Sequence, residues 1–427
     1  MHWWGMRMAS DTVAAWELPE AWETTRLGSV VKIKSGFACA KRNLVSAEKG
    51  IAHLRPFNVD TKGQIDLSEV YYIPRDYKDN VEKYALEPGH VLFNNTNSVE
   101  LVGKTALVRE TLECAFSNHI YRLTLKPQAQ AQLDPAWLAL ALRRLWAGGY
   151  FEQRCNRWIG QAGFNSKMLR AVDIPLPSVD EQRRIVARSE ELFARIEEAQ
   201  CVRTAAYEYS DRLIDAALHE AFEVLGPERV PLRTILREKL RNGWSPRCQD
   251  SPPGTPVLRL GAVLGFEFNR SEVKYTQLQV KEDARYWLKS GDVLVSRSNT
   301  PALVGHAAIY RGTPSPCIYP DLLIRVRVDK DIADPQFVVY WLRGREIRNF
   351  VASRARGASS TMKKISQKDL REMPFPKVAP SEQRRLVAGL NEVKTQVTAL
   401  QRAQRTASAE LIRLEQSILA RAFQGEL

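Results

Sequence analysis

Two patterns contain residue types suited to covalent chemistry or metal binding, and both lack a required member. The segment Leu-Val-Gly-Lys-Thr at 101–105 is similar to the end of a phosphate-binding loop, but that motif needs a glycine where the chain has Ser98. A turn between two strands explains the segment. The six cysteines contain no Cys-x-x-Cys pair, and the six histidines have no metal-ligand spacing. We therefore predict neither a phosphate loop, a metal site nor a hydrolase site.

A DNA-methylating site is not indicated either. N6-adenine methyltransferases carry an Asn/Asp-Pro-Pro-aromatic motif, and no such tetrapeptide occurs here, since Pro252-Pro253 is preceded by Ser251 and followed by Gly254. We predict that the chain has no catalytic residue and holds no cofactor of its own.

Basic and amide side chains gather in two pairs of loops. Residues 154–167 and 353–364 combine Arg and Lys, which suit phosphates, with Asn, Gln, Ser and Gly; residues 94–97 and 296–299 present amide and guanidinium groups suited to base edges. Solvated loops and local turn capping explain these segments about as well, and core packing explains the pairing of Arg241 with the aromatic Trp244 equally well. The candidate DNA-binding residues are Asn94, Asn95, Asn97, Arg154, Arg157, Gln161, Asn165, Lys167, Arg241, Arg297, Asn299, Arg354, Arg356, Ser359, Ser360, Lys363 and Lys364.

Composition favours an intracellular nucleic-acid-binding protein. The 427 residues, 44% of them hydrophobic, are enough for two or three domains, and a net charge of +13 needs an anionic partner, of which nucleic acid is the leading candidate. The scattered cysteines fit a reducing cytoplasm. The first ten residues lack the apolar core of a signal peptide, and no stretch approaches the roughly 18 apolar residues of a membrane span.

The chain repeats itself at a spacing of about two hundred residues. Glu-Gln-Arg-Arg occurs at 181–184 and again at 382–385, each time after a Pro-x-Pro. The similarity extends over four pairs of segments: 89–108 with 291–310, 133–144 with 333–344, 164–186 with 365–387, and 213–222 with 414–423. A period of this size indicates two copies of one domain rather than a solenoid.

Each copy is expected to be an α+β domain followed by a long helix. Short β-branched runs alternate with Gly and Pro, and a helix is expected after Asp134-Pro135 and after Asp334-Pro335, where Asp caps and Pro takes the first helical position. The expected domains are 1–178 and 226–380, and the expected helices are 179–225 and 381–427.

The two long helices are expected to pair. From Leu386 through Leu400 and Leu414 to Ile418, apolar residues alternate steps of four and three, as in a coiled-coil seam, whereas the first helix has a weaker seam interrupted by Ser189, Arg203 and Ser210. Each helix of roughly forty residues would be about 60 Å long. We predict antiparallel pairing, with an internal pseudo-twofold relating the two domains.

The junctions "IPLPSVDEQRR" and "MPFPKVAPSEQRR", the opening segment 16–36 and the terminal "SILARAFQGEL" resemble the specificity subunit of type I restriction-modification systems. Two departures are that the first ten residues have no counterpart and that the second copy lacks the Trp-Glu that opens the first. The resemblance implies two target-recognition domains that each read half of a bipartite DNA site, joined by spacer helices on which methyltransferase subunits dock.

The resemblance also implies partners. We expect double-stranded DNA, two copies of an N6-adenine methyltransferase subunit and restriction-translocase subunits, which would hold S-adenosylmethionine, ATP and Mg. The candidate docking residues are Arg183, Arg184, Phe222, Arg384, Arg385, Phe423 and Leu427. The alternative is a coiled-coil scaffold with non-specific affinity for DNA. The recognised bases and the length of the gap between half-sites do not follow from the sequence.

Overall fold

The computed structural model describes residues 16, 18–77, 81–357 and 361–427. The chain forms two compact units: unit 1 comprises residues 1–202 and 406–427, and unit 2 comprises residues 203–405. Both long helices, α5 (Val179–Glu223) and α9 (Pro380–Phe423), are therefore divided between the units. A globular part and the helix segments packed on it share one core, which is why the division differs from the four-part division expected from the sequence.

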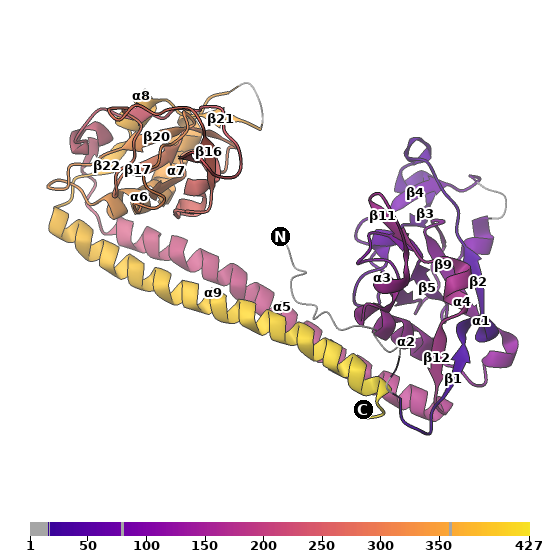
Figure 1. Ribbon diagram of the computed structural model, residues 1–427. Helices are drawn as coiled ribbons and strands as arrows, with labels where there is room; N and C mark the ends of the chain where they lie inside the picture. Colours follow the sequence, from indigo (N-terminus) through magenta and orange to yellow (C-terminus); the bar gives the residue numbers. More distant parts are fainter. Residues whose placement is uncertain (1–15, 17, 78–80, 358–360) are drawn as a thin grey trace. The chain divides into compact units, whose positions relative to one another are not determined.

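Unit 1 is built on a four-stranded antiparallel sheet of order β2-β9-β5-β7 (Figure 1). It also contains a three-stranded sheet of order β4-β3-β8, whose strands alternate in sequence with those of the first sheet. Its elements are β1 (Glu23–Arg26), α1 (Leu27–Val30), β2 (Val31–Ser35), β3 (Gly50–Leu54), β4 (Tyr71–Pro74), β5 (Val91–Asn94), β6 (Thr96–Asn97), β7 (Thr105–Leu107), β8 (Cys114–Phe116), β9 (Ile120–Leu125), α2 (Pro135–Ala147), α3 (Tyr150–Arg154), β10 (Asn156–Trp158), β11 (Gln161–Gly163), α4 (Ser166–Arg170) and β12 (Asp173–Leu176).

Unit 2 repeats this plan with a four-stranded sheet of order β14-β20-β17-β19. Its elements are β13 (Arg229–Pro231), β14 (Arg241–Asn242), β15 (Thr255–Leu258), β16 (Val273–Thr276), β17 (Val293–Ser296), β18 (Ser298–Asn299), β19 (Ala307–Ile309), β20 (Leu323–Val326), α6 (Pro335–Arg343), α7 (Arg345–Arg354), β21 (Lys363–Lys364), α8 (Gln367–Arg371) and β22 (Pro374–Pro376). Strand register is also shared, because Leu92 faces Arg122 across β5 and β9 as Leu294 faces Arg325 across β17 and β20. The internal duplication and the α+β class are thus confirmed.

The glutamine of the repeated Glu-Gln-Arg-Arg motif is buried and forms hydrogen bonds to backbone groups in both units. Gln182 is completely buried; its Oε1 accepts a hydrogen bond from the backbone N–H of Asp134 at 2.9 Å, and its Nε2 donates to the carbonyls of Gln132 and Pro177. Gln383 makes the same three bonds in unit 2, to Asp334, Ile332 and Val378. Asp134 and Asp334 cap α2 and α6 as expected. The glutamine therefore fixes the start of each long helix to the capped end of the preceding short helix.

The Pro-x-Pro segments form edge strands in both units. β12 pairs with β1 and β22 pairs with β13, and the indole N–H of a buried tryptophan donates to each segment, from Trp137 to the carbonyl of Pro175 and from Trp341 to that of Pro374. Proline is tolerated there because an edge position leaves its missing donor without consequence.

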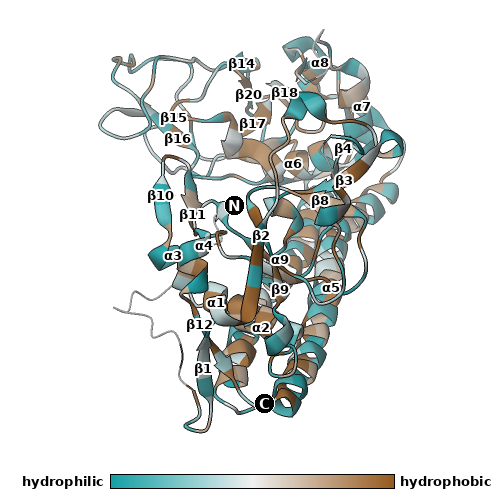
Figure 2. Cartoon of the chain, turned by 90° about the vertical axis from the view of Figure 1, so that its right-hand side faces the viewer, coloured by the Kyte–Doolittle hydropathy of each residue, from teal (hydrophilic) through white to brown (hydrophobic). Residues whose placement is uncertain are grey.

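Within each unit the segments of α5 and α9 run antiparallel. In unit 1, Ile185 near the start of α5 shares a core with Leu419 near the end of α9; in unit 2, Leu218 near the end of α5 shares a core with Leu386 near the start of α9. Figure 2 shows apolar and polar residues alternating along both helices, as amphipathic helices require. Among the described residues, no helix is both long and apolar enough to cross a membrane.

The expected heptad seam is wrong in two places. Leu400 and Leu414 are 39% and 49% exposed, whereas Ser408 is buried. Small and polar residues line the contact instead, and Gln401 donates to the hydroxyl of Ser210 at 3.2 Å. Ser189 and Ser210, which interrupt the first apolar pattern, are both fully buried. A straight α-helix has 3.6 residues per turn, so a strict heptad pattern drifts from the contact line unless the helices supercoil.

Candidate nucleic-acid interface

Two polar loops that are far apart in the sequence meet in unit 1. The short strand β6 pairs with β11, which pairs with β10, so that Asn97 lies opposite Ala162 and Arg157 lies on the adjoining hairpin. Arg157 and Gln161 are exposed. The structure thus brings the segment 94–97 and the segment 154–167 to one small sheet, as a common binding surface requires.

The equivalent loops meet in the same way in unit 2. β18 pairs with β21, placing Ser298 opposite Lys364 and Asn299 opposite Lys363, and the backbone N–H of Ile365 donates to the carbonyl of Arg297 at 2.9 Å. Arg356 forms a bridge with Lys364. Arg356 and Lys364 are exposed, whereas Lys363 is half-buried and donates to the carbonyl of Gly357. The candidates Ser359 and Ser360 lie outside the described residues.

One arginine has the same aromatic support in both units. Arg154 ends α3 with its guanidinium 4.2 Å from the ring centre of Tyr150, and Arg354 ends α7 with its guanidinium 5.5 Å from that of Phe350. Both arginines are exposed. In each case the aromatic ring lies one helical turn before the arginine, and attraction between the ring face and the positive charge favours this position of the guanidinium. These two arginines, predicted from loop composition, are therefore equivalent and partly ordered cations beside the small sheets.

Several of the predicted amides have structural roles instead. Asn94 is fully buried and Asn95 is 5% exposed; their amides donate to the carbonyls of Pro56 and Asn118. Asn299 is 9% exposed and accepts from the N–H of Thr300, and Asn165 caps α4 by accepting from Met168. For Asn94, Asn95 and Asn299 the assignment to the DNA interface is wrong, because a buried amide cannot reach a base edge. Lys167 is exposed on the first turn of α4.

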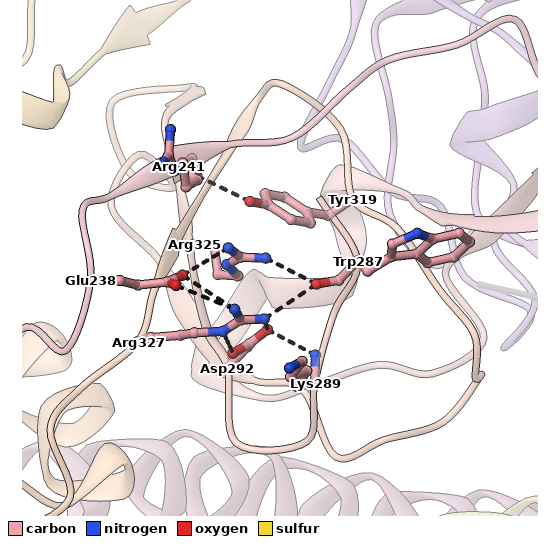
Figure 3. A network of polar contacts seen from close by, with 8 residues as sticks. All are labelled: Glu238, Arg241, Trp287, Lys289, Asp292, Tyr319, Arg325 and Arg327. Atoms are coloured by element: carbon pink, nitrogen blue, oxygen red, sulfur yellow. Dashed lines mark hydrogen bonds and ion pairs between the residues drawn. The ribbon is translucent and has the colours of Figure 1, made fainter. Parts of the chain in front are cut away.

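A buried polar network in unit 2 positions Arg241 (Figure 3). Arg327 binds both carboxylate oxygens of Asp292, at 2.6 and 2.9 Å, and Arg325 donates to Glu238 at 2.8 Å. The hydroxyl of Tyr319 donates to the backbone carbonyl of Arg241 at 3.2 Å. These contacts attach β14 to its neighbours, while the half-buried Arg241 side chain points away from the network.

The network consists of paired charges, although the Glu238 side chain is 40% exposed and the Nε of Arg325 has no hydrogen-bond partner. The hydrogen bond to Asp292 raises the pKa of Arg327, and burial raises the pKa of Tyr319 to about 12. Asp292 is 3% exposed and Arg325 is 4% exposed. Buried charges are retained in a folded protein chiefly when oppositely charged partners face them, as Asp292 faces Arg327 and Arg325 faces Glu238. We therefore assign these residues to positioning and not to contact with a ligand.

Only part of this network has a counterpart in unit 1. Arg122 donates to the carbonyl of Ala85 at 2.8 Å, as the equivalent Arg325 donates to that of Trp287 at 2.9 Å. Unit 1 has Thr124 in place of Arg327 and His90 in place of Asp292. Arg325 lies in β20 and Arg327 follows the strand directly. Their spacing of two residues is a sequence signal that our prediction did not use: in an extended chain it puts both side chains on one face.

A glycine in each unit allows a close backbone approach. A Cβ at Gly36 would lie 2.0 Å from the carbonyl oxygen of Phe116, and one at Gly243 would lie 1.9 Å from that of Tyr319. The following residues, Phe37 and Trp244, donate their N–H to the same carbonyls. The glycine at the end of β2 or β14 is therefore required for the strand to leave its sheet at this point.

The candidate docking residues divide into exposed and buried groups. Arg183 and Arg385 are exposed and pair with Asp134 and Glu382, Arg184 donates to the carbonyl of Leu427, and Arg384 is exposed. Phe423 is 2% exposed, 4.6 Å from the ring of Trp137; Phe222 is 9% exposed, 5.0 Å from that of Trp341. The assignment of these two phenylalanines to docking is wrong: they anchor helix ends in the core of their own unit.

Two leucines are better placed for docking. Leu213 on α5 and Leu414 on α9 occupy equivalent positions in the repeat and are 50% and 49% exposed. Leu414 lies in a pocket of unit 1 formed by α5 and α9, together with Leu192 and Leu411.

Among the described residues, no cluster of three or more His, Cys, Asp or Glu side chains is arranged to hold a metal ion.

Comparisons with known proteins agree with the repeat and the fold. Residues 19–201 match the family described as the type I restriction modification DNA specificity domain. The chain is 23% identical to the type I restriction enzyme EcoKI specificity subunit of Escherichia coli, over 97% of this chain and 91% of that protein. It is 22% identical to the StySPI specificity subunit of Salmonella potsdam, over 96% and 90%. Over nearly its whole length, the chain is similar to specificity subunits of type I restriction enzymes.

Solved structures of specificity subunits share the fold. A chain from a structure on the assembly and conformational transition of a type I restriction-modification system superimposes with a TM-score of 0.73 at 24% identity, covering 96% of this chain and 100% of that one. The HsdS subunit from Thermoanaerobacter tengcongensis gives a TM-score of 0.54, also at 24% identity, covering 96% and 99%. The family resemblance identified from sequence motifs is confirmed.

Proposed function

We propose that this specificity subunit reads a bipartite DNA site, one half-site with each unit, and performs no covalent chemistry itself. The proposal rests on one observation: the two units share the same backbone arrangement at the small sheet but carry different side chains there. β6 meets β11 in unit 1 as β18 meets β21 in unit 2, but Ala162 and Gly163 stand where unit 2 has Lys363 and Lys364. Two readers of different sequences need a common fold with divergent surfaces.

The phosphate contacts of both half-sites come from exposed cations at equivalent places. Arg154 and Arg157 serve unit 1, and Arg354, Arg356 and Lys364 serve unit 2. Gln161 is proposed for base edges in unit 1 and Arg297 in unit 2. Arg241, whose backbone carbonyl accepts a hydrogen bond from Tyr319, is proposed as a further contact of unit 2. Asn97, Lys167 and Lys363 remain proposed members of the same surfaces.

The subunit is proposed to assemble with two copies of an N6-adenine methyltransferase and, through them, with restriction-translocase subunits in the cytoplasm. S-adenosylmethionine, ATP and Mg are proposed to be bound by those partners. The support for two copies is the pair of equivalent exposed leucines, Leu213 and Leu414, because one partner that binds twice needs the same apolar contact twice. The exposed Arg183, Arg184, Arg384 and Arg385 remain proposed contacts, and Leu427 is proposed with them.

Selection of bound fragments from random DNA tests this function. The complex reconstituted with methyltransferase subunits is expected to enrich two short defined sequences separated by a gap of constant length. The alternative function, a coiled-coil scaffold with non-specific DNA affinity, predicts binding without enrichment. Recovery of unenriched DNA at physiological salt would favour the scaffold, since non-specific binding is electrostatic and independent of sequence.

A further inference from the structure

An apolar tip projects from the small sheet of unit 1. In the hairpin that joins β10 to β11, Trp158 is 60% exposed and Ile159 is 106% exposed. Gly160 follows with a φ of +76°, and a Cβ built on it would have no described atom within 4 Å. Ile159 has no packing role in its own domain, and with the exposed Trp158 it forms an apolar patch of the kind that marks interaction sites.

The tip is held in a defined position. Trp158 lies opposite Gln161 in the hairpin register, and β11 is paired on its other edge with β6. The indole of Trp158 also lies against Gly163, where an added Cβ would come within 2.8 Å of Cζ3. Ile159 is therefore presented at the end of a paired and laterally supported hairpin.

The surroundings of the tip are suited to a polyanion. Arg154 and Arg157 are exposed at the base of the hairpin, and Arg157 donates to the carbonyl of Glu152 at 3.0 Å, which orients its guanidinium. Apolar side chains flanked by arginines match a nucleic-acid groove, where cations meet phosphates and apolar groups meet or separate bases. The net charge of +13 favours DNA over a neutral protein surface.

We propose that Trp158 and Ile159 form an apolar wedge that enters the DNA between two bases of the half-site read by unit 1. This inference rests on the proposed function, because it requires that unit 1 bind DNA through this sheet. The equivalent sequence positions in unit 2 are Ser359 and Ser360. A wedge is accordingly expected at one half-site and not at the other.

The test uses the reconstituted complex and its selected DNA site. The fluorescent base 2-aminopurine is placed in turn at each A or T position of both half-sites, because its emission rises when stacking is lost. The adenine that the methyltransferase extrudes gives a rise in each half-site, and the wedge is expected to add a second rise at one step of the unit 1 half-site. Ile159→Ser should abolish that rise and weaken binding about tenfold, as expected for one lost base contact. The salt dependence of binding should be unchanged, because isoleucine contacts no phosphate.

Leu67→Ser is the matched control, since Leu67 is an exposed apolar residue of unit 1 outside the hairpin, at 47% exposure. It should leave fluorescence and affinity unchanged. Unchanged affinity of the Ile159→Ser complex, or no second fluorescence rise in the unit 1 half-site of the wild-type complex, would overturn the wedge while leaving the bipartite site intact. Loss of methyltransferase from the Ile159→Ser complex would also overturn it, by making the tip a protein contact. Failure of the proposed function is distinct, because then no half-site would be selected at all.

Discussion

At the scale of single residues, the buried glutamines decide how each long helix begins. Gln182 and Gln383 each satisfy one backbone N–H and two carbonyls that would otherwise be buried without partners. An unsatisfied buried polar group costs about 1–3 kcal/mol, more than its hydrogen bond contributes in net terms. The motif therefore conserves the geometry between a short helix and a long helix within each copy.

We predict that Gln182→Leu lowers the free energy of unfolding of unit 1 by about 3 kcal/mol, because three backbone groups lose their partner. Urea unfolding of the full chain, with hydrogen exchange of residues 130–140 to locate the loss, measures the effect. Arg183→Ala is the control from the same motif: its ion pair is 67% exposed on the arginine side, so a change within about 0.5 kcal/mol is expected. Equal effects of the two variants would contradict a structural role for the glutamine.

A buried histidine in unit 1 should make stability depend on pH. Burial, with help from nearby Arg55, lowers the pKa of His53 to about 4 from 6.5. Between these pH values the unfolded chain takes up a proton that the folded chain does not, so stability falls as pH decreases from about 6.5 to 4. The loss attributable to His53 is expected to reach about 3 kcal/mol at its largest.

Urea unfolding of the wild-type chain and of His53→Gln, at pH 7 and at pH 5, measures this dependence. The variant should show a flatter pH profile for unit 1, because glutamine does not titrate. His306 in unit 2, whose pKa burial also lowers to about 4, is retained in both chains and serves as an internal reference. An identical pH profile for the two chains would show that His53 stays neutral in both states or charged in both.

At the scale of the elements, the ends and the middles of the long helices have different tasks. The Ala-Phe ends pack under the short helices α2 and α6, and Phe222 and Phe423 each contact a tryptophan. About two and a half turns before these ends, Leu213 and Leu414 are half-exposed. The same helix therefore closes a core with its last turn and leaves an apolar side chain free just before it.

We predict that Leu414→Asp removes one methyltransferase copy from the complex while both units stay folded. A charge on an apolar contact costs binding free energy but little stability, because the side chain is already half in water. Native mass spectrometry of the reconstituted complex counts the copies. Leu213→Asp is expected to remove one copy as well, and the double variant both.

Phe423→Ala is the contrasting variant. Because Phe423 is 2% exposed, its removal should lower the stability of unit 1 by about 3–5 kcal/mol. It should affect assembly only through unfolding. Full assembly of both leucine variants would move the docking site to another face of the helices.

At the scale of the whole molecule, the long helices are expected to set the gap between half-sites. α5 has 45 residues and α9 has 44, which corresponds to about 67 Å at 1.5 Å per residue. Deleting seven residues from each helix should shorten the gap in the selected site by about three base pairs and leave both half-sites unchanged, because each unit keeps its own core. Selection with the shortened chain measures the gap; a gap of unaltered length would show that the helices do not determine it.

Local sequence signals were sufficient to predict the duplication, the α+β class, the positions of the long helices and the resemblance to type I specificity subunits. These follow from local signals, such as the Asp-Pro caps and the repeated junctions, which act over a few residues and survive in both copies. Tertiary structure alone decided which side chains of a motif are buried. From the sequence we predicted that Asn94 and Asn95 contact DNA and that Phe222 and Phe423 contact a partner, and we predicted no role for the glutamine of Glu-Gln-Arg-Arg. Each is enclosed by residues from distant parts of the chain, and burial is a property of those neighbours and not of the motif.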